Sequence, residues 1–295
     1  RREAGATGAR GEVLTPAATE RGRPTPHDVV GDFSIEAGAT IVTTGGIGGN
    51  HALVRERWPE RLGTPPATMV AGVPAYVDGA MLSVAERAGA TLIGSDRMWH
   101  YVEGLQNWDP IWPQHGIRIL PGPSSIWLDA TGKRLPVPLF PGFDTLGTLA
   151  HLRATGHDHS WFVLSERIVE KEFTLSGSEQ NPDLTGKDVA LLVRSRLGRG
   201  ASGPVRAFLE NGADFVRADR LEDLLAGMRD LPGGDALDPE RARREIEARD
   251  REMDNPFTKD AQVAMLRSAR AFRGDRLVRT ARPHRILDGS GGGLI

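Results

Sequence analysis

A glycine-rich run is the clearest candidate functional motif in this sequence. Residues 43–50 read TTGGIGGN, directly after the short β-rich stretch 39–44. Glycine has no Cβ, so its backbone can approach a ligand closely. A glycine turn at the carboxyl end of a strand is also where open α/β sheets bind nucleotides. The run is not the fingerprint G-x-G-x-x-G, because His51 stands where the last glycine belongs. It indicates either a nucleotide site or a tight structural turn.

A second chemically capable stretch is residues 97–118, RMWHYVEGLQNWDPIWPQHGIR, which combines aromatic rings with histidines and arginines. Such a loop suits the wall of a substrate pocket, since pockets are mostly apolar with a few polar groups. His100 is a candidate for proton transfer, because an unperturbed histidine has a pKa of about 6.5. The competing interpretation is that the rings pin an irregular loop to the core and that His100 is a hydrogen-bonded structural group.

Metal and nucleic-acid chemistry find little support. His157 and His159 form an H-x-H pair, but no H-E-x-x-H pattern accompanies them, and a solvated turn around Gly156 is favoured. The run 241–251 mixes arginine and glutamate evenly, which predicts a solvent-facing helix and not a nucleic-acid patch. We expect no metal site and no nucleic-acid partner.

The composition is ordinary for a globular protein of 295 residues, with 39% hydrophobic residues, 26% charged residues and a net charge of −2. That balance gives no electrostatic case for an anionic membrane or nucleic acid. Cysteine is absent, which excludes disulfides and cysteine-ligated zinc. No apolar run approaches the about 18 residues of a membrane span. A cytoplasmic location is expected.

The elements that would position these residues change character along the chain. Residues 8–14 and 29–36 predict a hairpin, and 39–44 predicts a buried strand that runs into the glycine turn. Residues 80–90 predict a helix ending at Gly89, and 126–129 predicts a strand. Farther on the pattern is mainly helical. The predicted helices span 146–154, 160–173, 189–197, 205–211, 221–231, 239–254 and 259–272.

Several motifs occur in an order that is typical of one family. The strand-like residues 41–46 read IVTTGG and are followed by Gly48–Asn50. Val77–Gly79 then opens a helix that ends Ala88–Ala90, reading AGA, and residues 127–134 read WLDATGKR. This series resembles the FAD-binding family of fumarate reductase flavoproteins and 3-ketosteroid Δ1-dehydrogenases. The corresponding family motifs are V-x-A-T-G-G with a G-x-N-like stretch, a G-D-G-like helix start, and a strand ending D-x-x-G-K-R.

The resemblance implies FAD as the cofactor. The glycine turn would lie beside the pyrophosphate and adenosine side of the flavin, where backbone N–H groups supply donors. Asp78 has a competing role as a cap for the helix that begins near Ala80. The implied cofactor-binding residues are Thr44, Gly45, Gly46, Gly48, Asn50, Asp78 and Gly79.

The resemblance also implies a chemistry. A dehydrogenase of this kind introduces a C=C bond next to a carbonyl group. The flavin accepts a hydride, while protein groups remove the neighbouring proton and polarise the carbonyl. Tyrosines do much of this work in 3-ketosteroid Δ1-dehydrogenases, so Tyr101 is the better candidate of the chain's two tyrosines, with His100 as its rival. Arg134 would orient a carbonyl or carboxylate, or form a structural salt bridge.

The substrate class follows from a departure in the same region. Fumarate reductases place a proton-delivering arginine shortly after the G-K-R motif, but no arginine occurs here between Arg134 and Arg153. The substrate expected is therefore an apolar ketone, such as a 3-ketosteroid. The oligomeric state is left open.

These observations predict an α/β fold, α+β overall. Residues 1–95 would form the C-terminal part of a Rossmann-like FAD-binding domain, 96–283 a mixed, largely helical substrate (cap) domain, and 284–295 the start of a return to the first domain. The family's N-terminal G-x-G-x-x-G unit and its C-terminal glycine-rich segment are expected to lie outside these residues. We therefore expect this chain alone to bind FAD weakly or not at all. The alternative is a non-catalytic binding or assembly module, or an inactive gene fragment.

Overall fold

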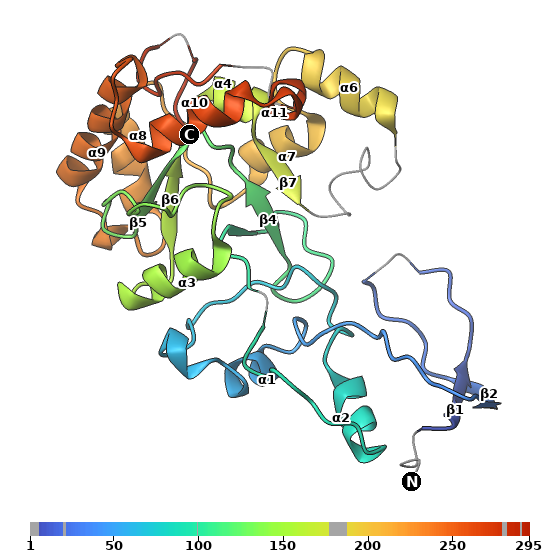
Figure 1. Cartoon of the computed structure of the whole chain (residues 1–295). Helices are drawn as coiled ribbons and strands as arrows, with labels where there is room; N and C mark the ends of the chain where they lie inside the picture. Colours follow the sequence, from blue (N-terminus) through green and yellow to red (C-terminus); the bar gives the residue numbers. More distant parts are fainter. Residues whose placement is uncertain (1–5, 20–21, 99, 177–187, 279–281, 290) are drawn as a thin grey trace. The chain divides into compact units, whose positions relative to one another are not determined.

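The computed structural model describes residues 6–19, 22–98, 100–176, 188–278, 282–289 and 291–295 (Figure 1). The chain divides into two compact units. Unit 1 comprises residues 1–59, 71–98 and 109–115, and unit 2 comprises residues 60–70, 99–108 and 116–295. Helices and strands are mixed along the chain, which confirms the α+β character of the prediction. The predicted domain boundaries at 95/96 and 283/284 remain predictions.

Unit 1 begins with a two-stranded hairpin. Strands β1 (Gly8–Leu14) and β2 (Val29–Glu36) pair antiparallel over the bounds expected from the sequence. Every residue of β2 is exposed. The helices of this unit are α1 (His51–Glu56) and α2 (Ala80–Arg87), both drawn in Figure 1.

The buried strand predicted at 39–44 is wrong. Residues 39–44 form no strand, and Ile41 and Val42 are 87% and 50% exposed. A strand needs a neighbour to accept its ladder hydrogen bonds, and no described strand of the chain pairs with this stretch. Its β-rich composition alone therefore does not bury it.

Helix α2 ends as its sequence predicts. Gly89 adopts a left-handed φ of 92° just after the helix. The amide of Gly89 donates to Glu86 O at 2.9 Å, and the amide of Ala90 donates to Ala85 O at 3.0 Å. These two bonds form a Schellman motif, which satisfies carbonyls at the helix end and favours glycine at its centre.

The described residues of unit 2 contain two small antiparallel sheets. One has the order β3–β4–β7, from strands β3 (Gly104–Gln106), β4 (Gly116–Leu120) and β7 (Thr174–Ser176). The other pairs β5 (Ile126–Asp129) with β6 (Ser160–Val163). All four residues of β5 are buried, and α9 packs against this strand.

The helices of unit 2 form most of its remaining structure (Figure 1). Those in the described ranges are α3 (Thr145–Ala154), α4 (Glu166–Lys171), α6 (Val189–Leu197), α7 (Gly203–Asn211), α8 (Leu221–Asp230), α9 (Pro239–Met253), α10 (Ala261–Ala271) and α11 (Arg273–Val278). Short 3₁₀ turns lie at Glu60–Leu62 and Gly234–Ala236. The hydrophobic clusters found among the described residues all belong to this unit. Most predicted helices are therefore confirmed, with ends shifted by one or two residues.

The single helix predicted at 160–173 is wrong. Residues 160–163 form β6, and only 166–171 are helical. Ser160–Val163 pairs with β5, and Ser165 ends the strand by capping α4, where its Oγ accepts from the amide of Ile168 at 3.4 Å. Long-range strand pairing and a local cap together override the apolar spacing from which the helix was inferred.

Candidate functional site

The glycine turn of unit 1 is an exposed, open stretch of backbone. Gly45 has a φ of 87°, a left-handed conformation that glycine adopts without strain. Thr44, Gly45 and Gly46 are exposed, and a Cβ added at Gly46 would meet nothing within 4 Å. Asn50 ends the turn as the N-cap of α1, with its Oδ1 accepting from the amide of Leu53 at 3.1 Å.

The second motif, Asp78–Gly79, opens α2. Gly79 is the N-cap and has a left-handed φ of 83°. Asp78 Oδ1 accepts from the amide of Ala80 at 2.9 Å. The N-cap role considered for Asp78 is therefore wrong, because Gly79 occupies that position and Asp78 is the residue before it.

The two motifs lie against each other within unit 1. The amide of Gly49 donates to Val77 O at 2.8 Å, and Asn50 Nδ2 donates to Asp78 O at 3.3 Å. A Cβ added at Gly79 would lie 2.7 Å from Cγ2 of Ile47, so glycine permits this close approach. The structure thus brings all the predicted cofactor-binding residues into one neighbourhood.

The free donors of the turn fit a phosphate-bearing cofactor. Across the described residues, the backbone amides of residues 45–48 donate to no protein acceptor. They lie on the exposed turn, where glycine leaves room for a ligand to approach the backbone. Such successive N–H groups can cradle an anion. Residues 44–50 with 78–79 are therefore suited to hold the pyrophosphate of a dinucleotide.

The aromatic loop is divided between the two units. Tyr101, His100 and Trp108 belong to unit 2, whereas Trp112 and His115 belong to unit 1. Trp112 is buried, its Nε1 donates to Ala71 O at 2.9 Å, and its ring stacks on His115 at a centroid distance of 3.6 Å. Trp112 therefore plays the pinning role considered for these rings. Trp99 lies outside the described residues.

His100 and Tyr101 are the acid–base candidates in unit 2. Burial lowers the pKa of His100 below the usual histidine range. A neutral imidazole at pH 7 is able to accept a proton. Tyr101 is 52% exposed, and the guanidinium carbon of Arg118 lies 4.1 Å from the centre of its ring.

Arg134 is held by acidic and amide groups. Its Nη1 pairs with Asp260 Oδ2 at 2.5 Å, its Nη2 donates to Asp260 Oδ1 at 3.1 Å, and its Nε donates to Gln262 Oε1 at 3.0 Å. This two-pronged pairing is the geometry that arginine forms with carboxylates. Every nitrogen of the Arg134 guanidinium has a protein partner. This arrangement is the structural salt bridge that was considered as the alternative role for this residue.

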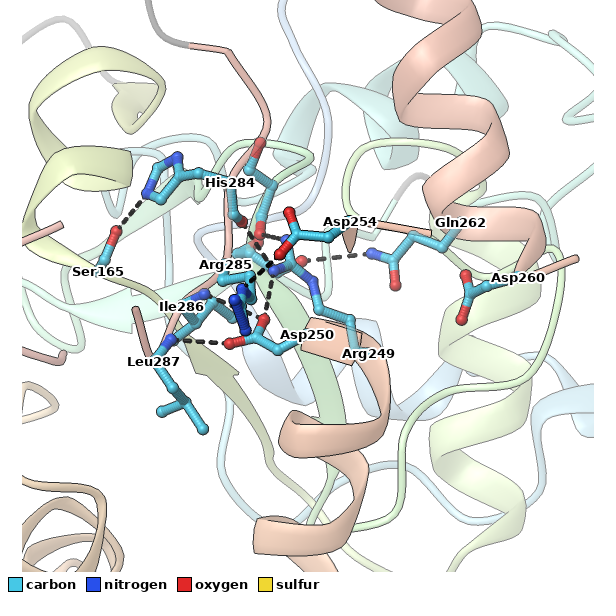
Figure 2. A network of polar contacts seen from close by, with 12 residues as sticks. Ser165, Arg249, Asp250, Asp254, Asp260, Gln262, His284, Arg285, Ile286 and Leu287 are labelled. Carbon is cyan, nitrogen blue, oxygen red and sulfur yellow. Dashed lines mark hydrogen bonds and ion pairs between the residues drawn. The ribbon is translucent and has the colours of Figure 1, made fainter. Parts of the chain in front are cut away.

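The sequence interpretation missed a buried charged network in unit 2 (Figure 2). Arg249 is fully buried; its Nη1 donates to Asp250 Oδ1 at 2.7 Å and to His284 O at 2.9 Å, and its Nη2 donates to Ser124 O. Asp250 also accepts from the amides of Ile286 and Leu287, at 3.0 and 2.7 Å. Burial lowers the pKa of Arg249, while the Asp250 carboxylate opposes that shift.

This network corrects the expectation that residues 241–251 face solvent throughout. The buried positions of α9 include Ala242, Ile246, Arg249 and Met253. They follow one another at steps of four, three and four residues, which places them on a single helix face. That spacing was the signal that Arg249 lies on the apolar stripe and needs a buried partner.

In the part of the chain that the structure describes, no group of three or more histidine and acidic side chains could hold a metal ion. Asp158 instead accepts from the amide of Ala67 at 2.8 Å and pairs with Arg153. No helix within the described ranges is both long and apolar enough to cross a bilayer.

Comparison with protein families defines the class. The family model described as "FAD binding domain" matches residues 3–284. The chain therefore belongs to the FAD-binding domain family, which confirms both the resemblance seen in the motifs and FAD as the cofactor.

Curated relatives narrow the similarity. A KsdD-like steroid dehydrogenase of Mycobacterium tuberculosis is 56% identical over 289 residues, which cover 98% of this chain and 51% of that protein. A KsdD-like steroid dehydrogenase of Mycolicibacterium smegmatis is 56% identical over 288 residues, covering 98% and 52%. The chain spans about half the length of these relatives.

One solved structure is similar over most of the chain. It is a 3-ketosteroid delta1-dehydrogenase from Sterolibacterium denitrificans in complex with 1,4-androstadiene-3,17-dione, with a TM-score of 0.48 and 14% identity. The match covers 96% of this chain and 45% of that one.

Proposed function

We propose that the whole protein to which this chain belongs is an FAD-dependent dehydrogenase that oxidises a CH–CH bond beside a ketone, on a 3-ketosteroid-like substrate. The observation that carries the proposal is the contact between the two motifs, made by Gly49 with Val77 and by Asn50 with Asp78. The family match and the names of the steroid dehydrogenase relatives support it.

The glycine turn would bind the cofactor. Its unbonded amides at residues 45–48 would donate to pyrophosphate oxygens, and the open space at Gly46 would let the phosphates reach the backbone. Thr44 and Gly48 flank this point, and Asn50 and Asp78–Gly79 would keep the turn in shape. Bound FAD would supply the hydride acceptor for the oxidation.

Two side chains of unit 2 would take part in the reaction of the substrate. Removal of the proton beside the carbonyl needs a group that is unprotonated at neutral pH, and the lowered pKa of His100 suits that role. Tyr101 has a hydroxyl that can donate to the ketone oxygen, and its side chain is half-exposed. We propose a structural and not a chemical role for Arg134, which is supported by the bonds of its guanidinium to Asp260 and Gln262.

Flavin binding tests the cofactor assignment. In the complete protein, Gly46→Ala places a methyl group where the phosphates would approach, so FAD should bind about tenfold more weakly, equivalent to about 1.4 kcal/mol. Gly38→Ala is the matched control, since an added Cβ there also meets nothing within 4 Å. Equal flavin affinities for both variants, measured by quenching of flavin fluorescence, would remove the glycine turn from the site.

Turnover tests the substrate class. The flavin-loaded complete protein should oxidise 3-ketosteroids with an artificial electron acceptor and should reduce fumarate more slowly or not at all. Faster fumarate reduction would contradict the proposal. Failure of the complete protein to bind any flavin would favour a non-catalytic binding module.

A further inference from the structure

The guanidinium of Arg118 lies over the Tyr101 ring in unit 2. The guanidinium carbon of Arg118 lies 4.1 Å from the ring centroid, well within the about 6 Å range of cation–π attraction. Tyr101 precedes β3 in an irregular segment and is 52% exposed. The guanidinium of Arg118 therefore restrains the Tyr101 ring from one side.

Arg118 is itself firmly placed. It belongs to β4, the middle strand of its sheet, and lies opposite Gly104 on β3 and Ser176 on β7. A residue of a middle strand has neighbours on both sides, so its backbone cannot move without breaking the sheet. The guanidinium therefore projects from a rigid base.

A buried carboxylate fixes the head of the same side chain. Arg118 Nε donates to Glu103 Oε2 at 3.3 Å, and the Glu103 side chain is 1% exposed. The backbone of Glu103 is tied to β4 as well, because its carbonyl accepts from the amide of Ile119 at 2.8 Å. A buried carboxylate needs a charged or hydrogen-bonding partner, so Glu103 and Arg118 hold each other.

We propose that Arg118 is a positioning residue for Tyr101 and that Glu103 in turn fixes Arg118. The inference rests on the proposed function, in which the Tyr101 hydroxyl contacts the ketone. A group that polarises a carbonyl must be within hydrogen-bond reach of it, and a displacement of about 1 Å can cost about a hundredfold in rate. A planar guanidinium stacks flat on a ring, whereas the ammonium of lysine is a compact point charge.

The ring contact is measurable without cofactor or turnover. The chain has two tyrosines, Tyr76 and Tyr101, so incorporation of a fluorotyrosine gives two fluorine NMR resonances. Tyr76→Phe assigns them. Arg118→Met should shift and narrow the Tyr101 resonance, because the ring loses the charge above it and turns more freely. Glu103→Gln should shift it in the same direction by a smaller amount.

Matched variants keep this measurement interpretable. Arg243→Met is the control, since Arg243 is part-buried and ion-paired to Glu222 in the same unit, and it should leave both resonances in place. If Arg118→Met fails to fold because Glu103 is left as a buried unpaired charge, the double variant Arg118→Met/Glu103→Gln removes that charge. An unchanged Tyr101 resonance in the folded single or double variant would overturn the proposal.

Turnover by the flavin-loaded complete protein links the contact to the chemistry. Arg118→Lys keeps the charge but replaces the broad guanidinium over the ring with a compact ammonium, so kcat on a 3-ketosteroid should fall about tenfold while KM changes less. In a Tyr101→Phe background the same substitution should cost little more, because both changes disable one group. An undiminished loss in that background would overturn the inference while leaving the proposed function intact.

The two proposals fail in different ways. If Tyr101→Phe alone leaves turnover unchanged, the assignment of Tyr101 in the proposed function is wrong, and the positioning role falls with it. If Tyr101→Phe lowers kcat but Arg118→Lys does not, only the positioning role is wrong.

Discussion

Two regions of this protein hold their residues in place by opposite means. In unit 1, the glycine turn and Asp78–Gly79 are joined by backbone contacts such as Gly49 N to Val77 O, and much of the turn is exposed. In unit 2, Arg249 and Asp250 are buried, and their charged side chains bind two backbone segments, at Ser124 and at residues 284–287 (Figure 2). The first arrangement leaves amides available to a ligand; the second uses nearly all its polar groups internally.

Ligand binding and folding stability therefore depend on different regions of the chain. A turn that must accept phosphates needs unsatisfied donors, and those are tolerable only where water can reach them. A buried arginine needs the reverse, because each unpaired polar group in the interior destabilises the fold. Substitutions should therefore affect folding most in the Arg249 network and least at the exposed amides of the turn.

The largest effect is expected at the buried carboxylate. Asp250→Ala removes the partner of Arg249 and the acceptor for the amides of Ile286 and Leu287. Leaving a buried charge uncompensated costs about 3–5 kcal/mol. Urea unfolding of the chain should show this loss in the free energy of unfolding of unit 2.

An exposed acid on the same helix end is the control for that prediction. Asp254 pairs with Arg285 at 2.8 Å, but its side chain is 68% exposed. Asp254→Ala should cost less than about 1 kcal/mol, as exposed ion pairs usually do. Equal losses for the two variants would show that burial does not set the strength of this network.

The next largest effect is expected at Gly79, which lies in the contact between the two motifs. Gly79→Ala adds a Cβ 2.7 Å from Ile47 at a residue with a φ of 83°. A left-handed conformation costs a non-glycine residue about 1–2 kcal/mol, before the clash is counted. Amide hydrogen exchange of residues 47–54 should accelerate accordingly. Gly46→Ala, which meets no neighbour, should leave that exchange unchanged.

Two substitutions of Asn50 distinguish its role as the N-cap of α1 from its hydrogen bond to Asp78. Asn50→Ala loses both bonds, and loss of an N-cap typically costs about 1 kcal/mol. Asn50→Asp keeps an acceptor for Leu53 but loses the donor to Asp78 O. The Leu53 amide should exchange faster in Asn50→Ala, and its protection from exchange should be restored in Asn50→Asp. FAD affinity should be reduced in both variants, because both lose the donor to Asp78 O. Full recovery of both would mean that the link between the motifs is unimportant.

The smallest effect is a pH dependence at the Arg134 salt bridge. Burial alone would raise the pKa of Asp260, but hydrogen bonds and the charge of Arg134 outweigh it and hold the pKa below the ordinary value of 3.8. A carboxyl whose pKa is lowered by folding stabilises the fold above its unfolded pKa and loses that stabilisation as pH falls through its folded pKa. The stabilisation should thus be intact at pH 6 and decline below about pH 4.

Asp260→Asn removes the titrating group and is the test of that dependence. The variant should be less stable than the parent chain at pH 6, and the gap should narrow as the pH is lowered through 4 toward 3. Urea midpoints at these pH values report the difference. A gap that stays constant with pH would show that Arg134 gains nothing from the charge of Asp260.

Much of the local structure was predictable because its causes are local. The hairpin β1–β2, the Schellman end of α2 at Gly89 and most helices of unit 2 depend on neighbouring residues, and their bounds were close to those expected. The helix expected at 160–173 failed because β5, more than thirty residues earlier, pairs with residues 160–163. The strand expected at 39–44 failed because no described strand lies beside it.

The family, FAD as the cofactor, and the residues of the glycine turn and its partner motif could all be recognised from residue types in a fixed order. The contacts of Gly49 and Asn50 with residues 77–78, the pairing of Arg134 with Asp260 and the position of Arg118 over Tyr101 became visible only in the folded chain. Each of these contacts joins residues that are distant along the chain. A hydrogen bond or ring contact has a partner only after folding has brought the two groups within a few ångströms.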